Sequence, residues 1–457
     1  MEKLFRLKEN GTTVKTEIMA GITTFLAMAY ILAVNPVMLG DAGMNNQGVF
    51  MATALAAAVG TFIMAFLANY PIALASGMGL NAYFAYTICL GELADYTDPW
   101  KIALTAILVE GIIFIVLSAF KFRETLVNCI PENLKYGITT GIGLFITFIG
   151  LQNAGIAAAE ASTKVTLGDI ATAPVALALI GIVLIGVMLY FNIKGAILWG
   201  ILGTWVLGII AQLTGWYVVD PEAGVYSVLP VVNSVADFLP NFAALGETAF
   251  KFDFSFMVSN FAEFAVIVFA FLFVDLFDTV GTLIGVAAKG NLLDKEGKLP
   301  HVGKALMADA IGTVTGACLG TSTVTSFVES SAGVAEGGRT GLTAATSGVL
   351  FLLSMFLWPI FGAIPSFATA PALVVVGLFM MSSVLKVKFE GDTADVLGAF
   401  VAIIMMPFTY SIANGIMFGI LTWMILKIIR GKFKDIHPVM WIVFALFVFR
   451  IVTLAMV

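Results

Sequence analysis

Charged residues are scarce in this sequence. Only 11% of its 457 residues are Asp, Glu, Lys or Arg, whereas soluble domains carry roughly a quarter. Hydrophobic residues make up 60% of the chain, and the mean hydropathy is +1.02. Apolar runs of about 18 residues or more, each able to cross roughly 30 Å of hydrocarbon, recur along the whole length. A soluble globular protein is therefore excluded, and the sequence predicts a polytopic helical membrane protein.

Other absences exclude further classes of protein. Cys89, Cys129 and Cys318 are scattered without the spacing of metal ligands. No G-x-x-x-x-G-K-[ST] motif occurs, so the chain carries no ATP-hydrolysing motor of its own. The sequence has neither an intramembrane His cluster nor a nucleophile–base pair that indicates an enzyme. It also has no basic patch interleaved with aromatic residues. We therefore expect no cofactor, no metal, no catalytic residue and no nucleic-acid partner.

Apolar segments of membrane-spanning length fall into two sets of seven. The first set is predicted near residues 18–39, 50–70, 77–90, 101–120, 134–153, 173–191 and 195–214. The second set is predicted near residues 257–285, 303–319, 327–338, 342–362, 370–386, 394–410 and 412–429. A further apolar stretch at 438–457 either crosses the membrane or lies along its surface.

The distribution of positive charge orients these spans. With the N-terminus in the cytoplasm, 19 of the 23 Lys and Arg residues fall on the cytoplasmic side. Only Lys101, Lys164 and Lys251 fall outside, and Arg450 lies in the final stretch. The N-terminal segment MEKLFRLKENGTTVKTE is typical of a cytoplasmic tail rather than a signal peptide. The positive-inside rule therefore favours a multi-pass protein of the cell (plasma or inner) membrane with a cytoplasmic N-terminus.

Seven spans in each half place the second half upside down relative to the first. This is the inverted-repeat plan of many secondary transporters, in which a pair of short, Gly-interrupted segments marks the binding site. Pro71–Leu90 and Thr321–Gly338 are such a pair, each with a strand-like piece before a half-length helix. An offset of about 248 residues relates Asn81 of the first segment to Glu329 of the second.

The second short segment is too polar for lipid contact, and Glu329 is its buried carboxylate. Irregular backbone inside a membrane is tolerated only where protein buries it or a wet cavity lines it, and an intramembrane acid there indicates a functional site. Ser326 and Glu329 also fit the S-x-x-E capping box, so a structural cap is the competing interpretation. The two half-helices direct backbone N–H groups into the cavity, where Asn81 supplies a donor and an acceptor.

The span at 257–285 carries two carboxylates, Asp275 and Asp278, on one helix face. Burying both is costly unless they are paired or protonated. Burial and mutual repulsion favour the protonated form of at least one, which suits a proton carrier. The alternative is that both make packing hydrogen bonds to Thr and Ser of neighbouring spans.

Other polar and aromatic residues are weaker candidates. Packing or a span end accounts for three further acids, Glu110, Glu263 and Asp309. A surface ion pair is expected between Glu336 and Arg339. Aromatic rings near the half-helices are expected to pack, with stacking on a flat ligand as the alternative, at Tyr83, Phe84 and Phe327.

Three stretches of the sequence resemble one family of transporters. They are GMGLNAYF (77–84), VDLFDTVGTLIG (274–285) and TSTVTSFVESSAGVAEGGRTGL (321–342). The chain, from about residue 3 to 435, is similar to the adenine/guanine/hypoxanthine permeases. These form the azaguanine-resistance-type branch of the nucleobase–cation symporter-2 (nucleobase–ascorbate) superfamily. The resemblance implies an all-α membrane protein of about fourteen segments in a seven-plus-seven inverted repeat, often a homodimer, with short β-strands in segments three and ten.

The resemblance also implies domains and residue roles. A core domain (1–130 and 254–364) would move against a gate domain (131–215 and 365–457), with 216–253 as an extracytoplasmic loop. Carried over by motif, Asp275 and Glu329 would hold the purine edge, Asn81 would line the site, and Asp278 would support binding or coupling. Three neighbours of Glu329 are further candidates for substrate binding: Ser326, Phe327 and Val328. Proton coupling would involve Asp278, Asp275 or Glu329. The extra stretch at 438–457 departs from a strict count of fourteen.

The expected function is proton-coupled import of adenine, guanine or hypoxanthine by an elevator-like motion in the lipid bilayer. H⁺ is the expected coupling ion, with Na⁺ as the alternative. A transporter of the same fold could instead carry uracil, xanthine or an anion, although an anion site would present Arg or Lys. A channel is the alternative from another class. It would not need paired broken helices with acids at a closed midplane.

Overall fold

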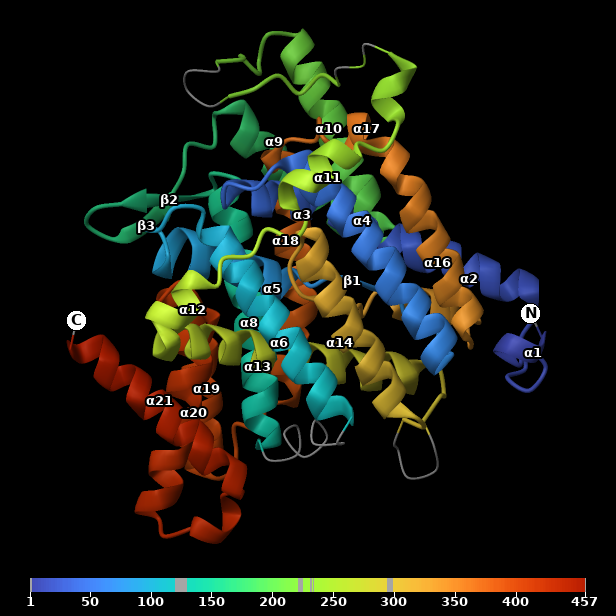
Figure 1. Cartoon of the computed structure of the whole chain (residues 1–457). Coiled ribbons are helices and arrows are strands. Elements are labelled where there is room, and N and C mark those ends of the chain that lie inside the picture. The colour runs from blue at the N-terminus through green and yellow to red at the C-terminus, as the bar shows by residue number, and fades with distance from the viewer. Residues whose placement is uncertain are drawn as a thin grey trace.

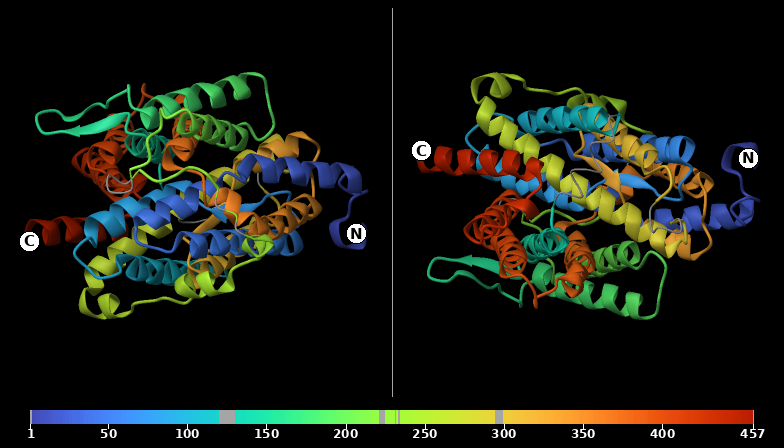
Figure 2. Two further views of the ribbon diagram at one scale, coloured as in Figure 1. Left: turned by 90° about the horizontal axis from the view of Figure 1, so that it is seen from above. Right: turned by 90° about the horizontal axis from the view of Figure 1, so that it is seen from below.

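The computed structural model is mostly helical (Figure 1). It describes residues 2–119, 130–220, 225–230, 232, 234–293 and 299–456. Cys129 and four of the basic residues used for orientation, Lys121, Arg123, Lys295 and Lys298, lie outside these ranges. The two termini lie at opposite ends of the molecule in every view (Figures 1 and 2).

The first half of the chain contains several long helices and one broken segment. Its helices are α1 (Glu2–Phe5), α2 (Val14–Met28), α3 (Ile31–Asp41), α4 (Asn46–Ile63) with its π-helical end η1 (Met64–Ala68), α5 (Met78–Ala82) with its π-helical continuation η2 (Tyr83–Glu92), α6 (Pro99–Ala119), α8 (Glu132–Asn153), α9 (Ala173–Tyr190) and α10 (Ala196–Leu213). Its strands are β1 (Leu74–Ser76) and the hairpin β2 (Ala157–Glu160) and β3 (Lys164–Leu167).

The second half follows the same plan. Its elements are η4 (Val235–Phe238), α11 (Phe242–Thr248), α12 (Ser255–Ser259), α13 (Phe261–Lys289), α14 (Val302–Leu319), β4 (Val324–Ser326), α15 (Ser330–Ala335), α16 (Gly341–Ser354), η5 (Met355–Leu357), α17 (Trp358–Phe361), α18 (Ser366–Met381), η6 (Ser382–Lys386), α19 (Thr393–Phe408), α20 (Ile412–Ile429), η7 (Phe433–Asp435) and α21 (Pro438–Met456). Within the described residues, 11 helical stretches are long and apolar enough to cross a membrane. The two broken segments and the helix Thr393–Phe408 are shorter, so the count of fourteen stays a prediction.

The helices form two groups that lie side by side (Figure 2). In one group α2, α4, α6, α14 and α16 surround β1 and β4, and α13 packs along it. In the other group α8, α9, α10, α18, α19 and α20 pack against one another. The C-terminal helix α21 contacts both α13 and α20, and the guanidinium of Arg450 pairs with Glu92 at 3.3 Å and with Glu263 at 3.8 Å.

The two predicted strands pair with each other across the halves of the chain. β1 and β4 are antiparallel, with Ala75 opposite Thr325 at the centre. A two-stranded ribbon leaves outward N–H and C=O groups that a membrane interior cannot satisfy. Thr61 of α4 meets this need by donating to the Leu74 carbonyl at 3.1 Å and accepting from its N–H at 2.9 Å. On the other edge, Thr313 of α14 donates to the Val324 carbonyl at 3.0 Å.

The predicted correspondence of Asn81 with Glu329 is wrong. β1 and β4 begin 250 residues apart (Leu74 and Val324), but α5 and α15 begin 252 apart (Met78 and Ser330). The physical reason is a longer turn in the second half. Gly77 alone joins β1 to α5, whereas three residues, 327–329, join β4 to α15. Glu329 therefore occupies the position of Gly77 immediately before its half-helix, and Asn81 lies one helical turn further along.

Two glycines let α4 and α14 cross beneath the ribbon. A Cβ on Gly312 would lie 3.1 Å from Val324 Cγ1 and 3.6 Å from the Cα of Gly60. A Cβ on Gly60 would lie 3.2 Å from the same methyl group and 3.5 Å from the Cα of Gly312. Each glycine thus faces the other helix and both strands, and a side chain at either position would press against Val324 and the opposite helix.

We predict that Gly312→Leu destabilises the protein, because the side chain would push α4 and the ribbon away from α14. Overpacking of this kind costs about 1–3 kcal/mol. Gly303→Leu is the matched control, since a Cβ there meets nothing within 4 Å on the same helix. Thermal unfolding monitored by size-exclusion chromatography should show a lower midpoint for Gly312→Leu alone. Equal midpoints for the two variants would contradict the close crossing.

Candidate functional site

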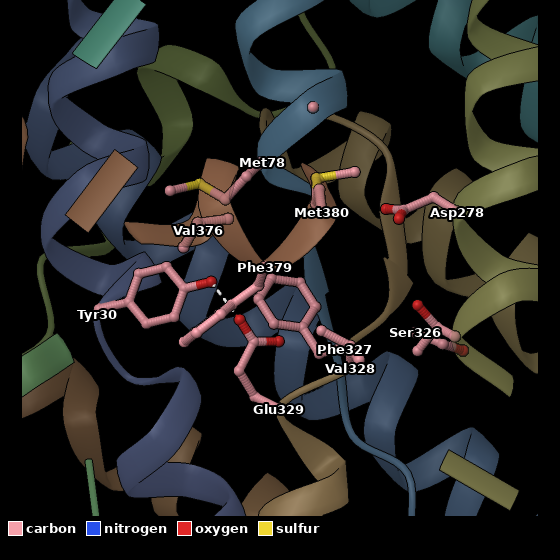
Figure 3. A pocket seen from close by; sticks show the side chains of 13 residues that line it. Tyr30, Met78, Asp278, Ser326, Phe327, Val328, Glu329, Val376, Phe379 and Met380 are labelled. Atoms are coloured by element: carbon pink, nitrogen blue, oxygen red, sulfur yellow. Dashed lines mark hydrogen bonds between the residues drawn. The ribbon is translucent and has the colours of Figure 1, made fainter. Parts of the chain in front are cut away.

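A cavity lies between the two groups of helices, where β1 and β4 end and their half-helices begin (Figure 3). The space between its lining residues, with the open mouth included, is about 420 Å³. Five parts of the chain form its wall: the α2–α3 turn, the start of α5, α13, the β4–α15 turn and α18. The lining residues are Tyr30, Gly77, Met78, Gly79, Asp278, Thr282, Ser326, Phe327, Val328, Glu329, Val376, Phe379 and Met380.

Glu329 reaches this cavity from the turn that precedes α15. Its Oε1 accepts a hydrogen bond of 2.6 Å from the Tyr30 hydroxyl. Tyr30 lies in the short turn between α2 and α3, and its side chain is almost fully buried. Sequence reasoning missed Tyr30. The available signal was a tyrosine in the middle of a long apolar stretch, where its hydroxyl needs a polar partner.

The capping box predicted for Ser326 and Glu329 does not form. Ser326 is the last residue of β4, and its N–H and Oγ point to Asp309 Oδ1, at 3.1 Å and 3.4 Å. Glu329 directly precedes α15, but no side-chain cap bond is made there. The box fails because the S-x-x-E spacing falls on a strand end and a turn rather than on the first turn of a helix.

The two aspartates of α13 face different surroundings. Asp278 lines the cavity, whereas Asp275 is buried and is not part of the cavity wall. Three residues along a helix leave the two side chains about 60° apart. Asp278 therefore faces the cavity, whereas Asp275 faces the buried polar contacts with α14. Figure 3 shows Asp278 and Ser326 on one side of Glu329, with Tyr30 on the other.

Asp275 belongs to a buried polar network behind the cavity. Its Oδ1 is 3.0 Å from Thr279 Oγ1, which is also 3.0 Å from both carboxylate oxygens of Asp309. The same hydroxyl lies 2.7 Å from Thr325 Oγ1 in β4. Because Asp309 also accepts the N–H of Ser326, this network connects α13, α14 and the end of β4. Asp309 was expected to have a structural role, and these contacts hold the β4–α15 turn in place.

Asn81 lies in a second buried network rather than in the cavity wall. Its Oδ1 accepts a hydrogen bond from Ser322 Oγ, and Nδ2 reaches the Ser76 carbonyl at 3.5 Å. Ser76 Oγ contacts Ser322 Oγ at 2.8 Å and Thr321 Oγ1 at 2.9 Å. Asn81 therefore connects α5 to the segment that leads into β4, and its predicted role in lining a binding site stays a prediction.

The weaker candidates have varied surroundings. Glu110 accepts from Thr323 Oγ1 at 3.3 Å. The predicted Glu336–Arg339 ion pair is wrong: Glu336 pairs with Lys194 at 2.7 Å, while the Arg339 guanidinium donates to the carbonyls of Val334 and Gly338. The tight turn at Gly337 and Gly338 directs the Arg339 side chain back over α15 rather than toward Glu336.

Glu17 of α2 is a buried carboxylate that sequence reasoning did not single out. It accepts hydrogen bonds from the N–H groups of Arg339, Thr340 and Thr343, and from the hydroxyls of both threonines. It therefore caps α16 from another helix. The sequence feature that could have indicated Glu17 is an acidic residue in the first turn of the apolar segment.

Two phenylalanines supply apolar surface to the cavity. Phe327 and Phe379 line it, from the β4–α15 turn and from α18. Tyr83 and Phe84 are buried elsewhere, and Tyr83 packs edge-on against Phe271 at a centroid distance of 4.8 Å. Of the three aromatic residues considered from sequence, Phe327 alone borders the cavity.

We predict that Thr279→Val lowers the stability of the fold, because Asp275 and Asp309 both lose their contact with its hydroxyl. Removing a hydrogen-bond donor from buried polar groups costs about 1–3 kcal/mol. Thr279→Ser retains the hydroxyl and is the control. Thermal unfolding of the purified variants should place Thr279→Val well below Thr279→Ser, and coincident curves would show that the network contributes little.

An inverted repeat with two broken segments around an intramembrane cavity defines a membrane transport protein. The solved transmembrane domain of a cyanobacterium bicarbonate transporter, BicA, has the same fold, with a TM-score of 0.64 over 88% of this chain and 97% of that one. The murine anion transporter Slc26a9 in the inward-facing state matches with a TM-score of 0.64, over 91% and 68%. Sequence identities are 15% and 12%, so these similarities concern the fold alone.

The chain belongs to the permease family, whose model matches residues 15–418. A guanine/hypoxanthine permease of Bacillus subtilis, PbuO, is 45% identical over 98% of this chain and 99% of its own length. The adenine permease AdeP of Escherichia coli is 40% identical over 99% and 96%. A putative permease of Methanocaldococcus jannaschii is 45% identical over 100% and 99%. The protein is thus a multi-pass membrane permease and not an enzyme.

Proposed function

We propose that this protein imports purine nucleobases (adenine, guanine or hypoxanthine) across the cell membrane. The observation that carries the proposal is the cavity, where two carboxylates, Glu329 and Asp278, lie among apolar and aromatic side chains. The relatives named as guanine/hypoxanthine and adenine permeases, which match over nearly their whole length, support the same substrate class.

The chemistry of the cavity suits a flat base with N–H groups on its edge. Ionised carboxylates only accept hydrogen bonds, and hydrogen bonds to charged acceptors are stronger than neutral ones. Glu329 and Asp278 would accept from the ring edge, while Phe327 and Phe379 would cover its faces. Asp275 lies outside the cavity wall, so we assign it to coupling rather than to the purine edge. Asn81 would support the site from behind, through Ser322.

Proton symport is supported by a count of hydrogens around Thr279. Its hydroxyl has one hydrogen to donate and two lone pairs. Its three neighbours are Thr325 and the carboxyl groups of Asp275 and Asp309. If both carboxyl groups were ionised, Thr279 could donate its hydroxyl hydrogen to only one of them. At its contact with the other carboxylate, two oxygens would then face each other with no hydrogen between them. A proton on Asp275 or Asp309 removes this conflict, so the pair is a reasonable place to carry the coupled proton.

An elevator-like motion of the first group of helices (core) against the second (gate) would expose the cavity to each side in turn. The cavity wall supports this arrangement, because α18 of the gate closes a site otherwise built by the core.

Polar contacts also join the two groups away from the cavity. Asn153 of α8 donates to Tyr86 Oη at 2.7 Å, and Thr87 Oγ1 donates to the Tyr410 carbonyl at 3.2 Å. We propose a cytoplasmic N-terminus, as the distribution of positive charge favours, and a homodimer, as the resemblance to the purine permeases implies.

An anion carrier of the same fold is the second candidate, favoured by the two solved transporters of similar fold. The described residues that line the cavity include two carboxylates and neither lysine nor arginine. A bound anion would face Glu329 and Asp278 without a compensating positive charge, and we therefore rank this candidate below a neutral base.

We predict uptake of radiolabelled adenine, guanine or hypoxanthine into proteoliposomes, and stronger uptake when an inward proton gradient is imposed. Glu329→Gln should lower uptake at subsaturating substrate by about tenfold to a hundredfold, the value of a hydrogen bond to a charged group. Asp275→Asn should weaken the response to the gradient. Uptake of uracil or bicarbonate in place of purines, or wild-type purine transport by both variants, would refute this assignment.

The proposed motion gives a separate prediction for the contact between Tyr86 and Asn153. Asn153→Leu breaks the link between core and gate, while the hydrogen bond of 2.8 Å from Tyr86 to Asp41 stays within the core. Maximal uptake should change severalfold with little change in the equilibrium Kd for the base. Gln152→Leu, one residue earlier on α8, is the control. If the core does not move against the gate, both variants should transport alike.

A further inference from the structure

Tyr30 is a polar residue of the cavity that lies outside both broken segments, as Asp278 and Thr282 of α13 also do. It lies where the first span is interrupted, between the end of α2 at Met28 and the start of α3 at Ile31. Its side chain is 1% exposed, and its hydroxyl donates to Glu329 Oε1 at 2.6 Å. This bond connects residues 299 apart in sequence and lies in the wall of the cavity.

The bond determines how the carboxylate of Glu329 is presented. A side chain with three rotatable bonds in a turn can adopt several orientations, and a fixed donor selects among them. With Oε1 held by Tyr30, Figure 3 shows the carboxylate between Tyr30 on one side and Asp278 with Ser326 on the other. The second oxygen, Oε2, is then left to accept from a molecule in the cavity.

We propose that Tyr30 is a positioning residue for substrate binding: it orients Glu329 so that Oε2 accepts an N–H of the base edge. This inference rests on the proposed function. Once the Tyr30 hydroxyl has donated its single hydrogen to Glu329, its oxygen retains lone pairs that can accept from the base as well. The two residues together form a surface of acceptors, which favours substrates that present adjacent N–H donors and disfavours bases whose edge at that place carries only acceptors.

A purely structural role is the competing explanation. Glu17 provides the comparison, because it also joins α2 to another part of the core through buried hydrogen bonds, yet it lies outside the cavity wall. A structural tie of that kind would affect folding and leave the affinity for the base unchanged in the folded fraction. A positioning residue would affect affinity and would do so only through Glu329.

A double-mutant cycle separates these explanations. The Kd for hypoxanthine is measured by isothermal titration calorimetry on purified wild-type protein, Tyr30→Phe, Glu329→Gln and the double variant. Tyr30→Phe should weaken binding by about tenfold or more, the value of a hydrogen bond to a charged group. The double variant should bind no more weakly than Glu329→Gln alone. Tyr83→Phe, another buried core tyrosine outside the cavity wall, should bind like the wild type.

The outcomes distinguish this inference from the proposed function. If wild-type protein binds none of the purine bases, the proposed function fails first. If wild-type protein binds a base and the two substitutions act independently, or Tyr30→Phe binds as wild type does, the positioning role is refuted. Should Tyr30→Phe prove unstable, Tyr30→Gln and Tyr30→Leu serve in its place, since Gln retains an N–H donor and Leu does not. Affinity retained by Gln and lost by Leu supports positioning, and equal losses overturn it.

Discussion

The rest of the structure depends on the hydrogen bonds of two short strands inside the membrane region. β1 and β4 each interrupt a span, and the interruption exposes N–H and C=O groups that lipid cannot satisfy. The strands satisfy one another along the shared edge, and Thr61 and Thr313 satisfy their outer edges. Because both threonines must lie close to the ribbon, α4 and α14 cross beneath it, and the crossing requires Gly60 and Gly312.

The same interruption creates the site. A span that stops at the middle of the bilayer leaves a half-helix whose first N–H groups face a space that the chain does not fill. The turn from β4 to α15 is two residues longer than the turn from β1 to α5, and these residues bring Phe327, Val328 and Glu329 into the cavity wall. The site is therefore asymmetric although the scaffold around it is symmetric, and only the second half supplies the carboxylate next to its half-helix.

Buried acids have three different functions in this structure. Glu17 caps α16, and Asp309 holds the end of β4 against α13. Glu329 and Asp278 instead face the cavity, where a ligand can take the place of an internal donor. The difference lies in the supply of donors around each carboxylate. The Glu17 carboxylate accepts five hydrogen bonds from the chain. Among the described residues, the Glu329 carboxylate accepts one side-chain hydrogen bond, from Tyr30.

Composition and hydropathy by themselves determined the membrane class, the helical fold and the paired broken segments, because lipid restricts a spanning chain to a few regular solutions. Motifs also identified Glu329 and Asp278 as candidates. Tertiary structure decided which acids face the cavity, since 60° around α13 separates Asp278 from Asp275. It alone revealed Tyr30, whose partner is 299 residues away. Local periodicity predicts which face of a helix is polar, but the partner of each polar group depends on how distant helices pack.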